Sequence, residues 1–145
     1  MKIELKPINK ENWFECTQLK VDEEQKSFVA SNTFSLAQAG FQEKTYPVAI
    51  YSNESMVGFL MYDYDTERDC WEMCRLMIDK KFQNKGYGRE ALINLIELVR
   101  NEHGHVKFFT SYELENEIAS KLFESVGFVR TGNMFEGEEL VSMIL

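Results

Sequence analysis

The most informative segment of this sequence reads Leu76-Met77-Ile78-Asp79-Lys80-Lys81-Phe82-Gln83-Asn84-Lys85-Gly86-Tyr87-Gly88-Arg89. It starts as an apolar strand, continues as a polar loop and reaches two glycines where a helix is expected to begin. Glycines at that place let the backbone approach a ligand closely, and the free N–H groups of a helix start favour an anion. The segment has four basic residues and one acidic residue, in a chain of net charge −8. This local positive charge points to a phosphate-bearing ligand.

The glycines alone leave several interpretations open. A Walker loop needs the pattern G-x-x-x-x-G-K-[ST], which the segment lacks. The dinucleotide pattern G-x-G-x-x-G/A is matched by Gly86, Gly88 and Ala91, but in that motif the strand runs almost directly into the first glycine. Here the stretch 79–85 intervenes, and the next expected strand ends in Phe109-Thr110-Ser111 instead of an acidic residue for a ribose. A glycine-rich helix start without any ligand is a further interpretation.

Hydrophobic periodicity predicts strands and helices along the whole chain. Strands are expected at 3–7, 46–51, 56–64, 70–79, 106–111, 128–131 and 140–145. Helices are expected at 10–26, in a short segment before Gly40, at 89–101 and at 115–126, with Gly127 as a left-handed cap. No linker-like stretch interrupts this pattern. One domain is therefore expected over residues 1–145, with α/β or α+β architecture around a mixed sheet.

Composition narrows the class of protein. The chain has 145 residues, of which 44% are hydrophobic, and this is enough for a buried core. Its acidity argues against nucleic acid as a partner and favours cationic ligands. Three cysteines cannot build a multi-bridge disulfide framework. The first residues lack the apolar core of a signal peptide, and the longest apolar run, 57–62, is too short to span a bilayer. A cytoplasmic protein with no membrane partner is expected.

Two motifs in register carry a resemblance to a known family. Residues 76–89 closely resemble motif A of the GNAT N-acyltransferase superfamily, in which an apolar strand and a short loop lead into Gln/Arg-x-x-Gly-x-Gly/Ala. Downstream, the motif B pattern is matched by Asn116-x-x-Ala119-x-x-Leu122-Phe123-x-x-x-Gly127-Phe128. A narrower resemblance, to bacterial spermine/spermidine acetyltransferases of the Bacillus type, rests on residues 75–79 and on Val21-x-x-x-Gln25-x-x-Phe28-Val29-Ala30-Ser31. The family implies an α/β (α+β) fold with a mixed, mostly antiparallel sheet of about six to seven strands and about four helices.

The resemblance implies acetyl-CoA as the co-substrate and assigns residues to it. The pyrophosphate would lie on the glycine loop, which comprises Gln83, Asn84, Lys85, Gly86, Tyr87, Gly88 and Arg89. The pantetheine arm would pair like an extra strand with backbone groups of Leu76, Met77 and Ile78. Asn116 matches the motif B asparagine that reaches this arm. Phe123 completes the cofactor-binding set, at a position where many members carry tyrosine.

The implied reaction is direct attack of a neutral amine on the thioester, with the coenzyme A thiol as leaving group. An amine with a pKa of about 10.4 is almost fully protonated at pH 7, so a general base is useful. Glu72 lies eleven residues before Gln83, the spacing of the catalytic glutamate in histone-type members. Strand alternation puts Glu72 on one face with Cys74 and Leu76 if no bulge intervenes. A solvent-facing strand glutamate is the alternative interpretation.

Phe123 departs from the family pattern, because phenylalanine cannot protonate the departing thiolate. The proton would then come from another hydroxyl, such as that of Tyr112, or from water. Glu72 and Tyr112 are accordingly the candidate catalytic residues. In the alternative interpretation, Phe123 is simply an aromatic core residue of the helix.

Acidic residues outside these motifs indicate the substrate. They form two groups: Asp22, Glu23 and Glu24 after the first helix, and Asp63, Asp65, Glu67, Asp69 and Glu72 around a turn between strands. Aromatic rings are interleaved with the second group. Carboxylates beside rings suit an aliphatic polycation, because rings cover methylenes and attract ammonium groups. The candidate contacts to a small polyamine are Glu23, Glu24, Tyr62 and Tyr64, and a solvated acidic turn is the alternative.

Other functions remain as alternatives. Cys70 and Cys74 lack two further ligands at suitable spacing, so no metal site is expected. The acceptor could instead be an aminoglycoside-like cation or a protein N-terminus. A coenzyme A-binding sensor without turnover is a third possibility, which Phe123 motivates. A homodimer is expected only because members of the superfamily are often dimers.

Overall fold

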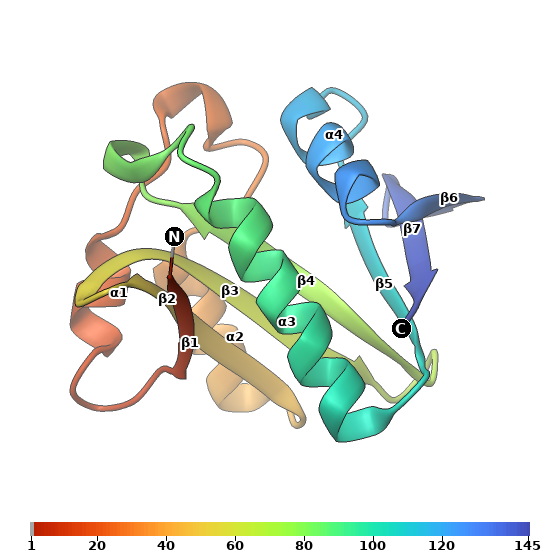
Figure 1. The fold of residues 1–145 in the computed structure, drawn as a ribbon, viewed down its shortest axis with the longest axis horizontal. Helices are drawn as coiled ribbons and strands as arrows, with labels where there is room; N and C mark the ends of the chain where they lie inside the picture. The colour runs from red at the N-terminus through yellow and green to blue at the C-terminus, as the bar shows by residue number, and fades with distance from the viewer. Residues whose placement is uncertain (1) are drawn as a thin grey trace.

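The computed structural model describes residues 2–145, and in this range seven strands form one mixed sheet in the order β1-β2-β3-β4-β5-β7-β6 (Figure 1). The strands are β1 Ile3–Pro7, β2 Thr45–Ser52, β3 Ser55–Asp65, β4 Cys70–Ile78, β5 Lys107–Tyr112, β6 Val129–Phe135 and β7 Glu138–Ile144. Neighbouring strands are antiparallel except β4 and β5, which are parallel. The prediction of an α/β (α+β) fold around a mixed, mostly antiparallel sheet is confirmed.

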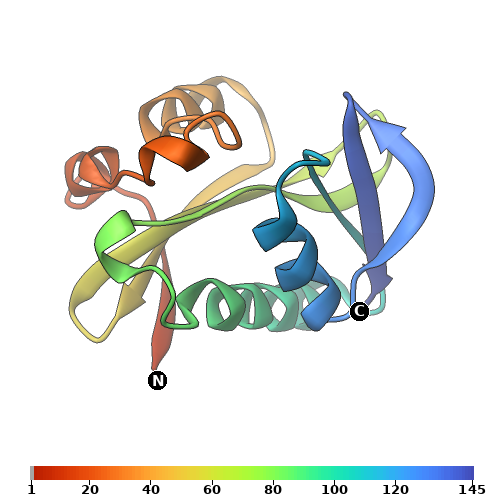
Figure 2. The same ribbon diagram turned by 90° about the horizontal axis from the view of Figure 1, so that it is seen from above.

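Helices cover both faces of the sheet. Within the described range the α-helices are α1 Trp13–Gln18, α2 Asn32–Phe41, α3 Tyr87–His103 and α4 Glu117–Ser125. Figure 2 shows α3 on one side of the central strands and α1 with α2 on the other. Two 3₁₀ turns, Glu23–Gln25 and Lys80–Phe82, lie in the loops after α1 and β4. No helix within residues 2–145 combines the length and apolarity needed to cross a membrane.

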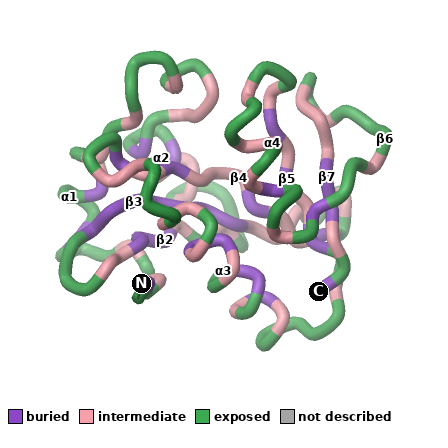
Figure 3. The backbone as a smooth tube through the Cα atoms, turned by 45° about the horizontal axis from the view of Figure 1, so that its top comes forward, coloured by how far each residue is buried: buried purple, intermediate pink, exposed green. Residues whose placement is uncertain are grey.

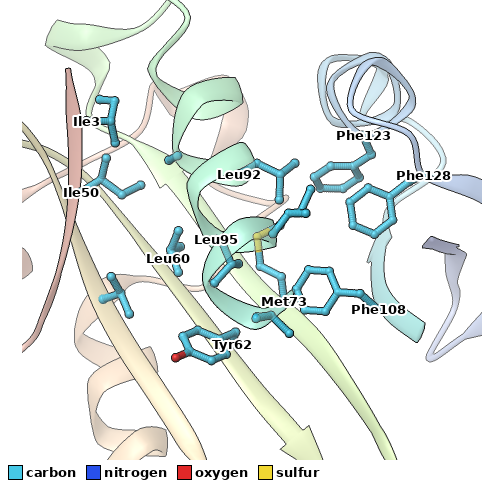
Figure 4. Close-up of a cluster of buried hydrophobic side chains, with 14 of the residues drawn as sticks. Ile3, Ile50, Leu60, Tyr62, Met73, Leu92, Leu95, Phe108, Phe123 and Phe128 are labelled. Carbon is cyan, nitrogen blue, oxygen red and sulfur yellow. The ribbon is translucent and has the colours of Figure 1, made fainter. Parts of the chain in front are cut away.

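The larger hydrophobic core lies between the sheet and α3. Leu92 and Leu95 on α3 are fully buried against side chains of the central strands such as Leu60 and Met73 (Figure 4). Each buried leucine contributes about 1.5–3 kcal/mol by leaving water. A smaller core on the opposite face consists of Cys16, Ala49, Met56, Phe59, Met61 and Met77. Figure 3 shows buried positions along the central strands and one stripe of α3, so β3 and β4 are held from both sides.

The parallel strands β4 and β5 pair only where they begin. Within the described chain the register joins two residue pairs, Trp71–Phe108 and Glu72–Phe109, and extends no further. Beyond this junction the two strands diverge, as Figure 1 shows. The second half of β4 is therefore held by β3 on one edge and leaves its other edge free.

A β-bulge interrupts β4 just after this junction. The register of β3 against β4 skips Cys74, which is an extra residue on β4. As a result, Cys74 packs against the smaller core and Leu76 against the larger one. The expectation that Glu72, Cys74 and Leu76 share one face was conditional on a regular strand, and the bulge overturns it for Leu76.

The helix predicted at 10–26 is much shorter in the structure. α1 ends at Gln18, and Leu19 is extended, with φ −72° and ψ 137°. The next backbone groups bond to the loop after β4: the Lys20 N–H donates to Asp79 Oδ1 at 2.8 Å, and the Lys80 N–H donates to the Lys20 carbonyl oxygen at 2.8 Å. These tertiary hydrogen bonds occupy the donor and acceptor that a longer helix would use.

Other boundaries differ by a few residues from the predictions. α3 begins at Tyr87 instead of 89, and α4 begins at Glu117 instead of 115. β6 extends to Phe135 instead of 131, because a tight turn joins it directly to β7. The two turn residues, Glu136 and Gly137, have φ of 50° and 82°, as the common two-residue hairpin turn requires.

Gly58 on β3 lies where the core has no space for a side chain. A Cβ atom added there would meet the Met77 carbonyl oxygen at 2.5 Å and Ile78 Cδ1 at 2.7 Å. We expect Gly58→Ala to lower the free energy of unfolding by about 1–3 kcal/mol, measured as a lower urea midpoint at constant slope. Gly40→Ala in α2 is the matched control, since nothing lies within 4 Å of its added Cβ. Equal midpoints for Gly58→Ala and the wild type would contradict this packing.

Candidate functional site

A cleft of about 880 Å³ opens where β4 and β5 diverge. β4 and the loop after it form one wall, the end of β5 and α4 form the other, and the segment 21–30 borders the cleft as well. Most of the predicted site residues line it: Glu72, Leu76, Met77, Ile78, Gln83, Asn84, Gly86, Tyr87, Gly88, Arg89, Tyr112, Asn116 and Phe123. Residues that are far apart in the sequence thus meet in one cavity.

The start of α3 forms one region of the cleft wall. Gly86 precedes the helix with φ 86° and ψ 5°, a left-handed conformation that favours glycine. The first backbone N–H groups of any α-helix have no partner within the helix, and Gly86 has no side chain to cap those of this 17-residue helix. These N–H groups are therefore available to a ligand. The helix dipole adds positive potential at the same place. This arrangement can bind a phosphate group.

Hydrogen bonds hold the loop before α3 against its neighbours. Gln83 Nε2 donates to Gln25 Oε1 at 2.8 Å and to the Ile78 carbonyl oxygen at 2.9 Å. Asp79 is only 3% exposed, and its carboxylate accepts from the backbone N–H groups of Lys20 and Lys81. The glycine loop is thereby joined to the segment 21–30, and both border the cleft.

The free edge of β4 forms the middle of the wall. The Thr110 hydroxyl donates to the Met73 carbonyl oxygen at 2.9 Å and marks the end of the junction with β5. Beyond it, no strand of the described chain pairs with this edge of β4, and Leu76, Met77 and Ile78 line the cleft there. An extended ligand that carries amide groups can hydrogen-bond to such an edge.

A group of carboxyl side chains lines another region of the cleft: Asp63, Asp65, Glu72, Glu136 and Glu138. Arg68, in the turn between β3 and β4, donates to Asp65 Oδ2 at 2.8 Å and to Glu72 Oε1. The same guanidinium lies 3.9 Å from the centroid of the Phe135 ring. Burial acts to raise the pKa of Asp65, but the hydrogen bonds from Arg68 outweigh it and hold that pKa below its ordinary value. Asp65 therefore stays ionised.

Asp63 differs from the other acids of this group. Its Oδ1 atom is buried and has no hydrogen-bond partner among the described residues. Burial, and then the neighbouring Glu72 carboxyl, raise the pKa of Asp63 to about 7. Asp63 therefore exchanges its proton near neutral pH, where an ordinary aspartate is fully ionised.

The cysteines are unsuited to nucleophilic chemistry. Burial raises the pKa of Cys74, which lines the cleft, and the nearby Asp63 adds to the effect. Burial also raises the pKa of Cys16 to about 12 and that of Cys70 to about 11. All three thiols stay protonated at neutral pH. In residues 2–145, no three His, Cys, Asp or Glu side chains are grouped so that they could hold a metal ion.

The wall formed by β5 and α4 holds the remaining predicted residues. Asn116 caps α4, because its side-chain oxygen accepts from a backbone N–H of the first turn at 3.1 Å. The rings of Tyr112 and Phe123 lie 6.1 Å apart, and the Ser120 hydroxyl donates to the Tyr112 hydroxyl at 3.3 Å. Phe123 is 5% exposed and packs on Phe128 in the larger core (Figure 4). Its ring thus belongs to the core and to the cleft wall at once.

The two tyrosines predicted to contact a ligand lie outside the cleft. Tyr62 and Tyr64 form an aromatic row with Trp71, at centroid distances of 6.2 and 5.3 Å. Tyr62 and Trp71 belong to the core under α3, on the opposite face of the sheet from Cys74. The prediction for both tyrosines is therefore corrected. Alternation along β3 places Tyr62 and Tyr64 on one face of the sheet and Asp63 on the other. The sequence alone does not tell which of these faces borders the cleft.

Three charged residues of the predicted site also lie outside the cleft. Glu23 is ion-paired with Lys26 on the surface at 2.6 Å, and Glu24 is exposed on the same turn. Gln25, which follows them, is the residue of this turn that lines the cleft. Lys85 is exposed on the glycine loop. The local sequence places these residues near the site but cannot tell which way each side chain points.

Two arginines that shape the site were not among the candidates. Arg68 lies in the acidic turn between β3 and β4 and bonds to the carboxyl groups of Asp65 and Glu72. Arg75 lines the cleft, and its guanidinium donates to Ser35 Oγ at 3.2 Å, to Gln38 Oε1 at 2.9 Å and to the Cys74 carbonyl oxygen at 2.9 Å. It thereby ties the bulge in β4 to α2. No local pattern marks such a residue, since its partners on α2 lie far away in the sequence.

Known proteins resemble this chain over nearly its whole length. The acetyltransferase (GNAT) family model matches residues 6–128. Over 97% of each chain, the sequence is 29% identical to a probable spermine N(1)-acetyltransferase of Bacillus subtilis subsp. natto. It is 28% identical to a spermine/spermidine N(1)-acetyltransferase of Bacillus subtilis strain 168, also over 97% of each chain.

Solved structures match the fold. A domain from Methanocaldococcus jannaschii superimposes with a TM-score of 0.80 at 19% identity, covering 99% of both chains. A spermidine N-acetyltransferase from Vibrio cholerae, crystallised with CoA and spermine, superimposes with a TM-score of 0.75 at 15% identity, covering 99% of this chain and 94% of the other. At these sequence identities the two superpositions support a common fold and nothing further.

The titration of Asp63 should be visible in the stability of the protein. Because the pKa of Asp63 rises from 3.8 to about 7 on folding, the folded protein holds this proton more tightly than the unfolded chain. The wild type therefore loses stability relative to Asp63→Asn as the pH rises from about 4 to about 7. We expect the variant to gain on the order of 2–4 kcal/mol relative to the wild type across this window, measured by urea unfolding.

Asp65→Asn is the control of opposite sign. Folding lowers the pKa of the wild-type Asp65 carboxyl. The Asp65→Asn variant should therefore lose stability relative to the wild type as the pH rises through the ordinary titration range of aspartate. A stability difference between Asp63→Asn and the wild type that does not change with pH would contradict the environment described for Asp63.

Proposed function

The chain belongs to the acetyltransferase (GNAT) family, and on this premise we propose that it transfers the acetyl group of acetyl-CoA to an amine nitrogen of a small polyamine, such as spermine or spermidine. The observation that carries the proposal is the cleft between β4 and β5. It connects a helix start suited to phosphate with a group of carboxylates suited to a cation. The names of the curated relatives support the same class of substrate.

The helix start suits the nucleotide part of acetyl-CoA. We assign the pyrophosphate to the loop that precedes and opens α3, formed by Gln83, Asn84, Lys85, Gly86, Tyr87, Gly88 and Arg89. Backbone N–H groups make most of these contacts, because they are the donors that the helix itself leaves unused. The exposed Lys85 adds charge near the phosphates without lining the cleft.

The free edge of β4 suits the pantetheine arm. The arm would run antiparallel or parallel to Leu76–Ile78 and exchange amide hydrogen bonds with this edge, as an added strand does. Asn116 and Phe123 lie on the facing wall and would contact the arm from the other side. The arm would thus replace the strand partner that β4 lacks after its junction with β5.

The proposed chemistry is direct aminolysis of the thioester. The amine nitrogen attacks the carbonyl carbon, whose oxygen would accept from a backbone N–H near the bulge at Cys74. A carboxylate of the Asp63–Glu72 pair would take the proton of the amine. Because Phe123 carries no acidic proton, we assign proton donation to the departing thiolate to the Tyr112 hydroxyl. A thiol pKa of about 8.5 makes this donation undemanding.

The acidic region of the cleft suits a substrate with several ammonium groups. Glu136 and Glu138 would hold the distal ammonium groups, and the net charge of −8 favours the approach of any cation. The reacting nitrogen would lie at Asp63 and Glu72, next to the bulge. The proposal needs only one chain, and the homodimer expected from the resemblance stays a prediction.

A thiol-release assay with a panel of amines tests the proposed function. Purified protein and acetyl-CoA are combined with spermine, spermidine, a diamine, an aminoglycoside or a peptide with a free N-terminus. We expect the highest kcat/KM for the polyamines, because several carboxylates in the cleft match several ammonium groups. A higher value for the aminoglycoside or the peptide would overturn the substrate class. Binding of acetyl-CoA without thiol release for any amine would instead indicate a coenzyme A sensor, the alternative that Phe123 favours.

Gly88→Val tests the assignment of the pyrophosphate. A Cβ atom at Gly88 meets Ile78 Cγ1 at 3.6 Å and Leu122 Cδ2 at 3.8 Å, which is ordinary contact, so the fold should survive. The branched side chain would fill space next to the backbone on which the phosphates are proposed to lie. We expect the dissociation constant for acetyl-CoA to rise at least about tenfold, measured by calorimetry.

Gly40→Val in α2 is the matched control, since it makes the same change at a helix position that does not line the cleft. It should leave the affinity for acetyl-CoA unchanged. Unchanged affinity in Gly88→Val as well would remove the phosphate site from the start of α3.

A further inference from the structure

Two carboxyl side chains face each other across β3 and β4 in the cleft. Asp63 and Glu72 are direct cross-strand partners, and both line the cavity. At such positions side chains lie on the same face, with Cβ atoms about 4.5–5.5 Å apart. Two negative charges at this distance repel, so one of the two carboxyl groups needs a cation or a proton.

Arg68 supplies the cation to Glu72. Its guanidinium donates to Glu72 Oε1 and to Asp65 Oδ2, and it is held in place over the Phe135 ring. A substrate amine that approached Glu72 would have to compete with this guanidinium for the same oxygen. Glu72 is therefore poorly placed to take a proton from the substrate.

Asp63 receives no hydrogen bond from Arg68, which bonds to Asp65 and Glu72. The Oδ1 atom of Asp63 is buried, and no group in the described part of the chain donates a hydrogen bond to it. The donor that it lacks is what a substrate ammonium group provides. Asp63 also lies beside Cys74, the bulge residue, near which the thioester is proposed to lie.

Few helices and strands contribute charged side chains near Asp63. The titratable and charged groups that face it are Asp65 on β3, Arg68 in the turn, and Glu72 and Cys74 on β4. Arg75 on β4 points toward α2, where it bonds to Ser35 and Gln38. α2 itself, Asn32–Phe41, carries no ionisable side chain. On β2 the partner of Asp63 is Thr45, and the neighbouring Lys44 lies over the Tyr64 ring.

We propose that Asp63 is a catalytic residue, the group that takes the proton of the substrate amine, and that Glu72, fixed by Arg68, is a positioning residue beside it. This inference rests on the proposed acetyl transfer and names the base of that reaction. It departs from the expectation that Glu72 itself is the base.

The proposed step conserves protons and electrons. The bound ammonium gives one proton to the Asp63 carboxylate, which becomes a neutral carboxylic acid. The amine lone pair then forms the C–N bond to the thioester carbonyl carbon, and the C–S bond breaks with its electron pair on sulfur. The nitrogen loses its second proton to water, the Tyr112 hydroxyl protonates the thiolate and regains a proton from water, and Asp63 returns its own proton to solvent. Each turnover yields the amide, the coenzyme A thiol and one released proton.

The proton affinity of Asp63 suits this task. Burial, and then the adjacent Glu72, raise the pKa of Asp63 from 3.8 to about 7. Transfer of a proton from an amine to this carboxylate is therefore roughly a thousandfold less unfavourable than transfer to an ordinary aspartate. A general base acts best when its pKa lies near the working pH, and this condition holds for Asp63.

The pH dependence of kcat/KM tests the inference, because kcat/KM reports the pKa of the essential base in the free enzyme. The substrate is the polyamine that the wild type acetylates best, and the pH runs from about 5 to about 9. We expect the wild type to lose activity on the acid side with a midpoint near 7. Asp63→Asn should abolish this acid limb and lower kcat/KM by about 10²–10⁴-fold. Glu72→Gln should keep the limb but move it to lower pH, because the carboxyl that helps to raise the pKa of Asp63 is gone.

Glu54→Gln, in the exposed turn between β2 and β3, is the matched control and should reproduce the wild-type profile. A limb that persists in Asp63→Asn, or that disappears in Glu72→Gln, overturns the inference while the proposed function stands. Absence of thiol release by the wild type with every amine instead overturns the proposed function, and the inference with it.

A second measurement covers the case that Asp63→Asn fails to fold. The carboxyl ¹³C signal of Asp63 in the free wild-type protein should titrate with a midpoint near 7, and in Glu72→Gln at a lower pH. An ordinary midpoint near 4 in the wild type would overturn the inference.

Discussion

The early parting of β4 from β5 is the constraint from which the other features of this molecule follow. The parallel pair is joined at two residue pairs only, and the Thr110–Met73 hydrogen bond ends the junction. The two strands can diverge because each has its own packing: β4 lies against α3 and the core of Figure 4, whereas β5 is held by β7 and by aromatic contacts from Phe123 and Phe128. The resulting cleft has unpaired backbone donors and acceptors along its wall.

The bulge at Cys74 divides this cleft by chemistry. On one side lie the free edge of β4 and the start of α3, which together favour an extended ligand with phosphate groups. On the other side lie the carboxyl groups that β3 and β4 bring together, with Arg68 neutralising some of them but not Asp63. A donor of acetyl groups and a cationic acceptor could therefore meet at the bulge, each held by the end of the cleft that suits it.

Local patterns in the sequence were sufficient to predict the position of the glycine loop and the fold. The spacing of Gln83, Gly86 and Gly88, and the strand and helix around them, form one continuous stretch, and the structure brings these residues to the cleft. Predictions failed where tertiary contacts decide. The first helix is short because Asp79, distant in sequence, binds the backbone of Lys20. Tyr62 and Tyr64 lie on the closed face because the choice of face depends on α3. The pairing of Asp63 with Glu72 depends on a register that no local pattern encodes.

The most direct test of this account is a crystal structure of the protein with acetyl-CoA. We expect pyrophosphate oxygens about 2.7–3.2 Å from backbone nitrogens of the Gly86–Gly88 stretch, and pantetheine amides hydrogen-bonded to the free edge of β4. We also expect the thioester beside the bulge at Cys74. A cofactor bound elsewhere on the protein, or a closed gap between β4 and β5 with the cofactor excluded, would contradict these expectations.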